Sequence, residues 1–174
     1  MILGLDISTS RIGYCIIDDA ENLITHGEIK LKPKDSLEIR ADLFYSIMEQ
    51  LEETHDIKHI FIEQPFIAFS GGKTTAATMA KLQRFNGMCS YCVRLLFGFP
   101  ATLIQANKAR GLVGLKIKRG EKTKLKVIEW VEAKYPQGFI VEYTRHGNPK
   151  PGTDDMADAI VIANAGLKLN QENS

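Results

Sequence analysis

Hydrophobic positions along the chain alternate between short extended runs and longer stretches of helical spacing. Apolar runs at 2–7 and 12–18, followed by a third segment at 23–31, are typical of an antiparallel meander of strands. From Ser36 to about Thr54 the apolar positions recur every three or four residues, which predicts an amphipathic helix. Beyond it the pattern predicts a buried strand at 57–63, a long helix at 73–97, a strand at 101–105, and helices at 121–135 and 154–169.

This order of elements predicts an α/β fold. Because helices separate the later strands, those strands are expected to run parallel to the first. The chain has 174 residues, 44% of them hydrophobic, so we expect one domain over 1–170 and a disordered tail at 171–174. No signal-peptide pattern occurs and no apolar run approaches the roughly 20 residues that span a bilayer. We therefore expect a soluble intracellular protein.

The three cysteines, an odd number, agree with a reducing compartment. Cys89 and Cys92 form a C-x-x-C pair without a second pair, inside an apolar stretch. Packing inside a helix explains them better than a zinc or redox site.

Carboxylates stand at the ends of three otherwise apolar segments. Asp6 lies near the end of the first apolar run, Glu63 ends the strand at 57–63, and Asp155 and Asp158 lie near the start of the last helix. Desolvating a carboxylate costs several kcal/mol unless a cation or hydrogen bonds compensate, so one shared site explains all of them better than separate accidents.

In the last helix, Asp154 and Asp155 have a simpler explanation than a metal site. They follow Thr153, a natural N-cap, and the helix dipole favours acidic residues in the first turn. Asp158 lies beyond that turn among apolar residues. It shares a helical face with Asp155 at three-residue spacing and with Asp154 at four. The spacing leaves open which of the two pairs with Asp158.

Carboxylates brought together in this way predict a divalent metal. Two of them repel by about 4 kcal/mol at a separation of about 4 Å and an effective dielectric of about 20, and a cation reverses that sign. Mg²⁺ prefers hard oxygen ligands, and two ions about 4 Å apart would activate a water and stabilise the departing oxygen of a phosphodiester. No His/Cys ligand cluster occurs, which argues against zinc.

A basic segment indicates a polyanionic partner, although the net charge of the whole chain is only +1. Between 108 and 126 the only acidic residue is Glu121, and interspersed glycines predict an adaptable loop followed by a helix. A solvated helix face is the alternative. The cations are Lys108, Arg110, Lys116, Lys118, Arg119, Lys122, Lys124 and Lys126.

The motifs I-L-G-L-D-I-S-T-S-R-I-G-Y, I-E-Q-P-F and D-D-M-A-D-A-I-V-I-A together resemble the RuvC family of Holliday junction resolvases, in the RNase H-like superfamily. The resemblance spans nearly the whole chain. It implies an RNase H-like mixed five-stranded sheet, with three antiparallel strands and then two parallel ones, flanked by helices. It also implies a homodimer that makes paired nicks in four-way DNA, with two Mg²⁺ ions per site, or Mn²⁺ in their place.

The resemblance assigns roles residue by residue. It implies that Asp6, Glu63, Asp155 and Asp158 bind the metals and that Lys122 supports catalysis. Phe66 matches an aromatic residue that intrudes among the bases of the junction, and Lys108 or Arg110 falls near a second basic position of the family. The predicted DNA-binding residues are Phe66, Lys108, Arg110, Lys116, Lys118, Arg119 and Lys124.

The chain also departs from the family pattern. D-I-S-T-S replaces the more usual D-P-G, and the stretch before the last acidic pair looks longer. Both departures indicate a divergent member, such as those that bacteriophages carry, acting in the cytoplasm of a bacterium or an infected host. Forks, flaps and other branched DNA then join four-way junctions as expected substrates.

Other functions fit parts of the sequence. L-G-L-D-I-S-T-S also resembles the phosphate loop of actin-like ATPases, but those proteins need a second lobe that 174 residues cannot supply. S-G-G-K-T-T lacks the first glycine of a P-loop, since that position is Ile67. A nuclease acting on RNA, such as precursor ribosomal RNA, and a non-catalytic binder of branched DNA remain as alternatives. For a dimer interface the candidate is the apolar face of the helix at 73–97, with Met79, Leu82, Phe85 and Met88, which could equally be core.

Overall fold

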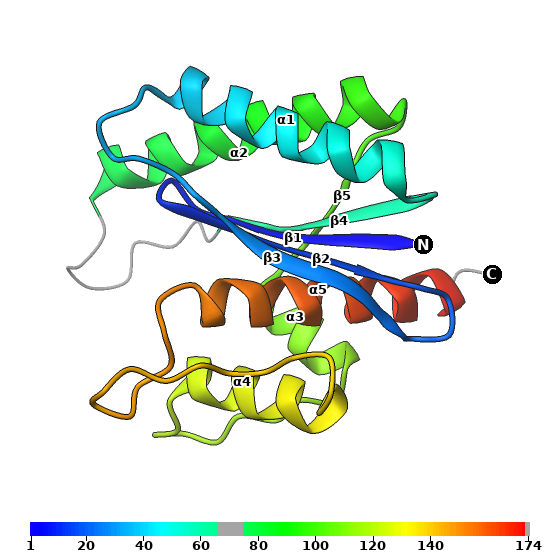
Figure 1. Cartoon of the computed structure of the whole chain (residues 1–174), viewed down its shortest axis with the longest axis vertical. Helices are drawn as coiled ribbons and strands as arrows, with labels where there is room; N and C mark the ends of the chain where they lie inside the picture. Colours follow the sequence, from blue (N-terminus) through cyan, green and yellow to red (C-terminus); the bar gives the residue numbers. More distant parts are fainter. Residues whose placement is uncertain (66–74, 173–174) are drawn as a thin grey trace.

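The computed structural model describes residues 1–65 and 75–172, which form one mixed sheet covered by helices on both faces (Figure 1). Its strands are β1 (Ile2–Ile7), β2 (Arg11–Ile17), β3 (Leu23–Lys30), β4 (His59–Glu63) and β5 (Thr102–Ile104). Within the described residues their order across the sheet is β3-β2-β1-β4-β5. β1, β2 and β3 pair antiparallel, whereas β4 runs parallel to both β1 and β5. The predicted RNase H-like sheet is confirmed.

Two layers of helices enclose the sheet (Figure 1). On one face, α1 (Leu37–Thr54) packs beside α2 (Ala76–Phe97). On the other face α5 (Thr153–Glu172) lies directly on the strands, and α3 (Ala106–Leu112) and α4 (Thr123–Lys134) pack against α5. The last helix is thus held between the sheet and two shorter helices.

Several helices differ from the prediction. α3 occupies part of the segment expected to be an adaptable loop; only Ala109 of this helix is buried, so its amphipathic pattern is weak. α2 begins at Ala76 after the N-cap Thr75, and residues 73 and 74 lie outside the described residues. α5 continues through Glu172, so 171 and 172 are helical and not a disordered tail, while 173–174 lie outside the described residues.

Alternation along β1 sends its side chains to two separate cores. Leu3 and Leu5 are fully buried against α1 and α2, whereas Ile2 is buried on the α5 side. Since alternate residues of a strand share a face, Gly4 and Asp6 also lie on the α5 side. The period of the strand therefore turns the only carboxylate of β1 toward the last helix.

Glycines allow α5 to lie unusually close to the sheet. A Cβ on Gly4 would stand 2.4 Å from the carbonyl oxygen of Ala159, and one on Gly13 would stand 1.9 Å from that of Asp155. Both are backbone atoms, which cannot rotate away as a side chain can. These contacts fix the position of the first turns of α5 over β1 and β2.

The apolar stripe of α2 belongs partly to the core. Phe85 is fully buried in the core between the sheet, α1 and α2, and Met88 packs against the same core. Cys89 is buried there as well, and burial raises the pKa of the Cys89 and Cys92 thiols. A raised pKa disfavours the thiolate, which supports packing as the role of this pair. Among the described residues no helix has the length and apolar character needed to cross a bilayer.

An ion cluster ties the turn between β2 and β3 to the helices below the sheet. The Lys134 and Lys168 ammonium groups both donate to the Glu21 carboxylate. These hydrogen bonds hold the pKa of Glu21 below its ordinary value of 4.5. The cluster joins the ends of α4 and α5 to the edge of the sheet.

Glu21→Gln should lower the free energy of unfolding by about 1 kcal/mol at neutral pH, because partly exposed ion pairs contribute about that much. The folded-state pKa lies below the unfolded one, so the stabilisation is present above pH 4.5 and disappears as the pH falls through the folded-state value. Urea unfolding of wild type and variant at about pH 7 and about pH 3 measures this. The exposed Glu53→Gln serves as control, and a difference that persists unchanged in acid would contradict the assignment.

Candidate active site

Asp6 and Glu63 lie at the carboxyl ends of the neighbouring strands β1 and β4, with Asp6 one residue before the last of β1. β1 and β4 pair in parallel up to Leu5 and Ile62, one residue before each carboxylate. Adjacent strands lie about 4.8 Å apart, so the two acidic residues follow as neighbours. Repulsion between them is one cause of the raised pKa of Asp6.

The first turns of α5 bring two more carboxylates over this end of the sheet. Gly13 of β2 lies opposite Asp6, and the carbonyl group of Asp155 stands directly over Gly13. Asp158, one turn further along the helix, has Glu63 as its strongest charged neighbour. Three elements that are far apart in the sequence thus place four predicted metal ligands at one end of the molecule.

These carboxylates disfavour one another's ionised forms. Burial raises the pKa of Asp6 well above its usual range, and repulsion from Glu63, Asp158 and Asp155 adds to the shift in that order. Burial, followed by repulsion from Glu63, raises the pKa of Asp158 to about 7. Burial is also the main cause of the raised pKa of Glu63 and of Asp155. A strongly perturbed acidic cluster at an exposed sheet end is typical of a functional site.

Basic residues border the cluster from three sides. The Lys124 ammonium of α4 donates to Asp154, and Arg11 of β2 places its Nε 3.7 Å from Asp155 Oδ2. Arg11 also donates to Glu28 on the edge strand β3. These ion pairs leave the cluster partly neutralised along the α5 side.

Arg110 of α3 is the third basic neighbour. Its charge opposes the upward pKa shifts of Glu63 and Asp158, so it lies within electrostatic reach of both. The sequence placed Arg110 among the DNA-binding residues, and its position is suited to that role, because a cation beside this acidic cluster can also contact a phosphate.

The pKa values of Asp154 and Asp155 are shifted in opposite directions. Burial alone would raise the pKa of Asp154, but the hydrogen bond and charge of Lys124, together with backbone N–H donors, bring it below the usual value. Asp155 keeps a raised pKa and disturbs Asp6 more strongly than Asp154 does. Asp155 therefore interacts more strongly with Asp6, whereas Asp154 adds to the repulsion on Asp158, and the choice of Asp155 over Asp154 as a metal ligand stays a prediction.

The donor set fits a hard divalent cation in its chemistry. Carboxylate oxygens are the ligands that Mg²⁺ and Mn²⁺ prefer, and a cation would relieve the repulsion among these acids. Within residues 1–65 and 75–172, no group of three or more His, Cys, Asp or Glu side chains is arranged to hold a metal ion. Asp155 is turned toward Arg11, so ligation requires side-chain rotations, which are small changes for partly exposed carboxylates.

The predicted lysine Lys122 occupies the N-cap position of α4 and is exposed. Among the described residues its ammonium makes no hydrogen bond or ion pair, whereas Lys124 reaches the acidic cluster. Phe66 lies outside the described residues. Lys108 on α3 has an exposed side chain, and so do Lys116, Lys118 and Arg119 in the loop before α4.

Arg11 and Glu28 were not singled out from the sequence. The available signal was the two-residue period of β2, which puts Arg11 on the same face as Gly13 and therefore beneath α5. Without knowing which helix covers that face, the period alone does not indicate a partner for Arg11.

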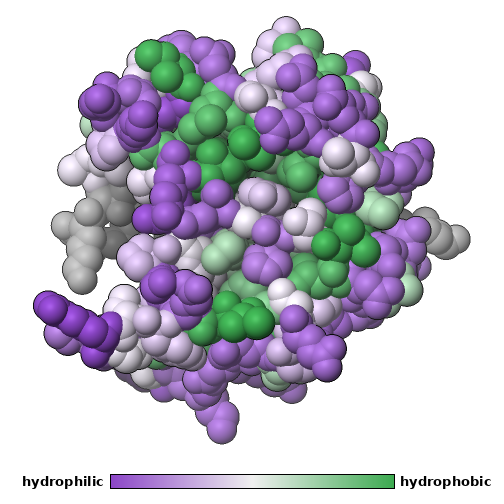
Figure 2. All heavy atoms as spheres, in the orientation of Figure 1, coloured by the Kyte–Doolittle hydropathy of each residue, from purple (hydrophilic) through white to green (hydrophobic). Residues whose placement is uncertain are grey.

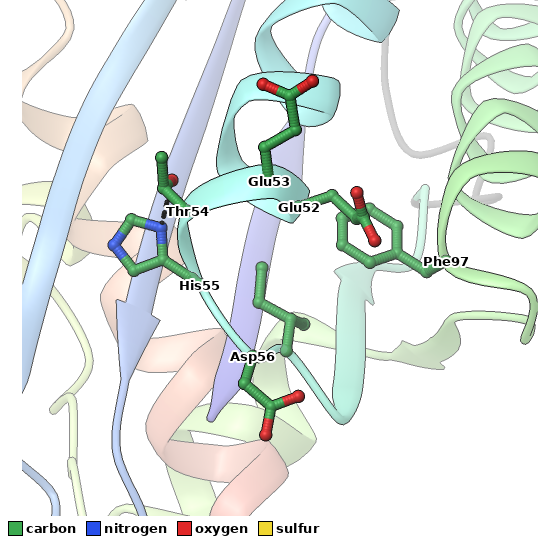
Figure 3. Close-up of a pocket in the computed structure, with 7 residues that line it drawn as sticks. Glu52, Glu53, Thr54, His55, Asp56 and Phe97 are labelled. Atoms are coloured by element: carbon green, nitrogen blue, oxygen red, sulfur yellow. Dashed lines mark hydrogen bonds between the residues drawn. The ribbon is translucent and has the colours of Figure 1, made fainter.

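A separate hollow of about 350 Å³ lies at the far end of the sheet (Figure 3). It is bordered by the end of α1 and by Phe97, beside the start of β4, whereas Glu63 ends that strand. Its acidic side chains Glu52, Glu53 and Asp56 point in different directions (Figure 3). This hollow is distinct from the carboxylate cluster.

Comparisons with known proteins agree with the geometry. No protein-family model matches the chain. A curated relative, the crossover junction endodeoxyribonuclease RuvC of Campylobacter hominis, is 31% identical over 100 residues, which are 56% of this chain and 60% of that protein. The matched region therefore spans about 60% of the relative's length.

Solved structures extend the likeness to the whole chain. RuvC of T. thermophilus, solved in complex with a Holliday junction substrate, has a TM-score of 0.68 at 13% identity, covering 98% of this chain and 94% of that one. The yeast mitochondrial Holliday junction resolvase Ydc2 has a TM-score of 0.59 at 16% identity, covering 98% and 79%. At such identities the likeness establishes the fold. The predicted resemblance to RuvC is thus confirmed in sequence over part of the chain, and the solved structures share its fold.

Proposed function

We propose that this protein is a metal-dependent endonuclease that cuts branched DNA, above all four-way junctions. The observation that carries the proposal is the convergence of Asp6, Glu63, Asp155 and Asp158 from three elements into one mutually repelling cluster. The similarity to RuvC and to a resolvase solved with a Holliday junction supports the choice of substrate.

These four carboxylates would hold the metal, with Mg²⁺ as the proposed ion, Mn²⁺ as its substitute and two ions per site. The metal supplies a Lewis acid for the scissile phosphate and lowers the pKa of the attacking water. The chain's own part is to position the ligands on a rigid sheet and helix and to surround them with cations. Lys124 and Arg110 stand where a phosphate beside the acids would need neutralising charge.

The quaternary structure follows from the symmetry of the substrate. A four-way junction presents two equivalent strands, and a twofold enzyme cuts both in one geometry, so we propose a homodimer. Exposed apolar residues are available on the outer helical layer, where Figure 2 shows hydrophobic residues gathered among polar ones. They include Ile39 and Leu43 of α1 and Tyr91 and Leu95 of α2. We propose that the described residues form one nuclease domain. We also propose that it acts on DNA in the cytoplasm of a bacterium or of a phage-infected host.

The direct test incubates the purified protein with Mg²⁺ and, in parallel, four-way DNA, duplex DNA, a flap and structured RNA. We expect paired nicks in the four-way DNA, weaker cutting of other branched DNA, and neither cutting nor tight binding of RNA. Chelating the metal should stop cutting without releasing the junction. Tight junction binding without nicks in Mg²⁺ or Mn²⁺ would indicate a non-catalytic binder of branched DNA. Cutting of RNA alone would indicate a nuclease that acts on RNA.

The exposed cations before and at the start of α4 should bind backbone phosphates. Replacing Lys116, Lys118, Arg119 and Lys122 with Ala should weaken junction binding and lower the slope of log affinity against log salt by about 0.9 for each phosphate that the variant no longer neutralises. Binding measured by fluorescence anisotropy over a range of salt gives the slope. Lys34→Ala with Lys58→Ala, two exposed cations elsewhere, is the control. An unchanged slope in the fourfold variant would show that this loop faces away from the DNA.

A further inference from the structure

A cavity of about 630 Å³ lies beside the acidic cluster, between the edge strand β3, the segment 140–151 and the start of α5. Arg11 lines it and also forms an ion pair with Asp155, so the cavity adjoins the proposed ligands directly. The segment 140–151, which borders the cavity, contains a small turn in which Tyr143 is bridged to Pro149. In Figure 1 this orange turn lies at the same end of the molecule as the start of α5.

The apolar wall of the cavity includes one side chain that contributes little to the core. Ile140 is 77% exposed, the highest value among the large hydrophobic residues that the structure describes. Its neighbours Phe139 and Val141 turn inward and pack on the core, so the extended backbone presents Ile140 outward. Pro151 and Met156 complete the apolar lining. A large exposed hydrophobic residue beside a polar site is suited to contact a ligand.

The remaining lining carries donors and acceptors in nearly balanced charge. Arg11 and Lys30 both pair with Glu28, and Lys150 pairs with Glu142. Three cations facing two carboxylates leave little net charge, which matches a free phosphate poorly. A nucleobase is neutral, presents donors and acceptors on its edge, and has flat apolar faces. A cavity of 630 Å³ lies within the range of small-ligand sites.

We propose that this cavity receives an unstacked nucleotide of the DNA strand that passes the acidic cluster, with its base against Ile140 and its edge facing the Arg11 and Glu28 pair. This inference rests on the proposed function. Branched DNA supplies such nucleotides, because bases at a crossover unstack at lower cost than those inside a duplex. The site would hold the strand in register for cutting, separately from the phosphate contacts of the basic loop.

The test uses the Asp6→Asn background, which keeps the DNA intact, and junctions carrying 2-aminopurine at successive positions around the crossover. Binding should raise the fluorescence at one or two positions, and Ile140→Glu should abolish that rise and weaken binding about tenfold. Ile140→Phe should retain both. The control Ile24→Glu places the same charge on an exposed isoleucine at the other end of β3, and should behave as the background protein does.

A second arm separates base from phosphate recognition. A junction with an abasic site at the responsive position should bind as weakly to the background protein as the intact junction binds to Ile140→Glu. If the abasic junction binds as tightly as the intact one, the cavity holds only backbone and the inference fails. It fails equally if no position responds, or if Ile140→Glu and Ile24→Glu give the same fluorescence, even when the wild type cuts junctions. A wild type that neither binds nor cuts branched DNA removes the proposed function and this inference with it.

Discussion

Asp6→Asn should abolish nicking of four-way DNA while junction binding persists. Losing a group that merely orients a metal ligand costs roughly 10- to 100-fold, so losing a central ligand should lower the nicking rate at least about 100-fold. The amide keeps the size of the side chain but removes the charge that a divalent cation needs. Single-turnover cleavage and anisotropy binding on the same junction measure the two effects separately.

Thermal unfolding gives a second readout of Asp6→Asn that does not depend on cleavage. Without metal the variant should melt above the wild type, because it removes a carboxylate that burial and four neighbouring acids disfavour. Mg²⁺ should raise the melting temperature of the wild type by preferential binding to the folded state, and should have little effect on the variant. Asp19→Asn, an exposed acid in the turn after β2, is the control. Continued nicking, or an equal Mg²⁺ response in both proteins, would remove Asp6 from the metal site.

Gly13→Ala should destabilise the protein by about 3 kcal/mol, at the upper end of the usual cost of overpacking. The new Cβ would stand 1.9 Å from the Asp155 carbonyl oxygen and 2.9 Å from the Met156 nitrogen, so the helix itself must move. The entropy that Ala removes from the unfolded chain returns only about 0.4–1 kcal/mol. The same displacement should carry Asp155 away from Asp6 and slow nicking, even in the molecules that remain folded. Urea unfolding and cleavage under folding conditions measure both.

Gly87→Ala provides the matched control for Gly13→Ala. Gly87 lies inside α2, and a Cβ placed there would meet nothing within 4 Å. The same substitution should therefore stabilise the protein by about 0.5–1 kcal/mol, because Ala favours a helix over Gly. If both variants unfold at the same urea concentration as the wild type, the close approach of α5 to the sheet is not a constraint on stability.

Local patterns in the sequence were sufficient for most of the elements. The run Ile2–Ile7 and the helix Leu37–Thr54 match their predictions, because burial on one or both faces imposes a period that the residue types record. The short helix α3 was not predicted, because such a period is missing from its sequence. One buried residue, Ala109, leaves no period to detect, and the helix is stabilised by packing against α5.

Local sequence patterns do not determine the full geometry of the candidate site. Motifs in the sequence predicted the carboxylates and the directions of the strands, since strand ends and helix starts determine which acids can meet. Asp154 and Asp155 are about 100° apart around a helix, and the sequence spacing alone lets either of them share a face with Asp158. The docking of α5 on Gly4 and Gly13, and of α4 on α5, determines which side of each helix faces the acidic cluster. Helix rotation depends on contacts between distant segments, and for that reason only the tertiary structure brought Arg11, Lys124 and Asp155 into one charged neighbourhood.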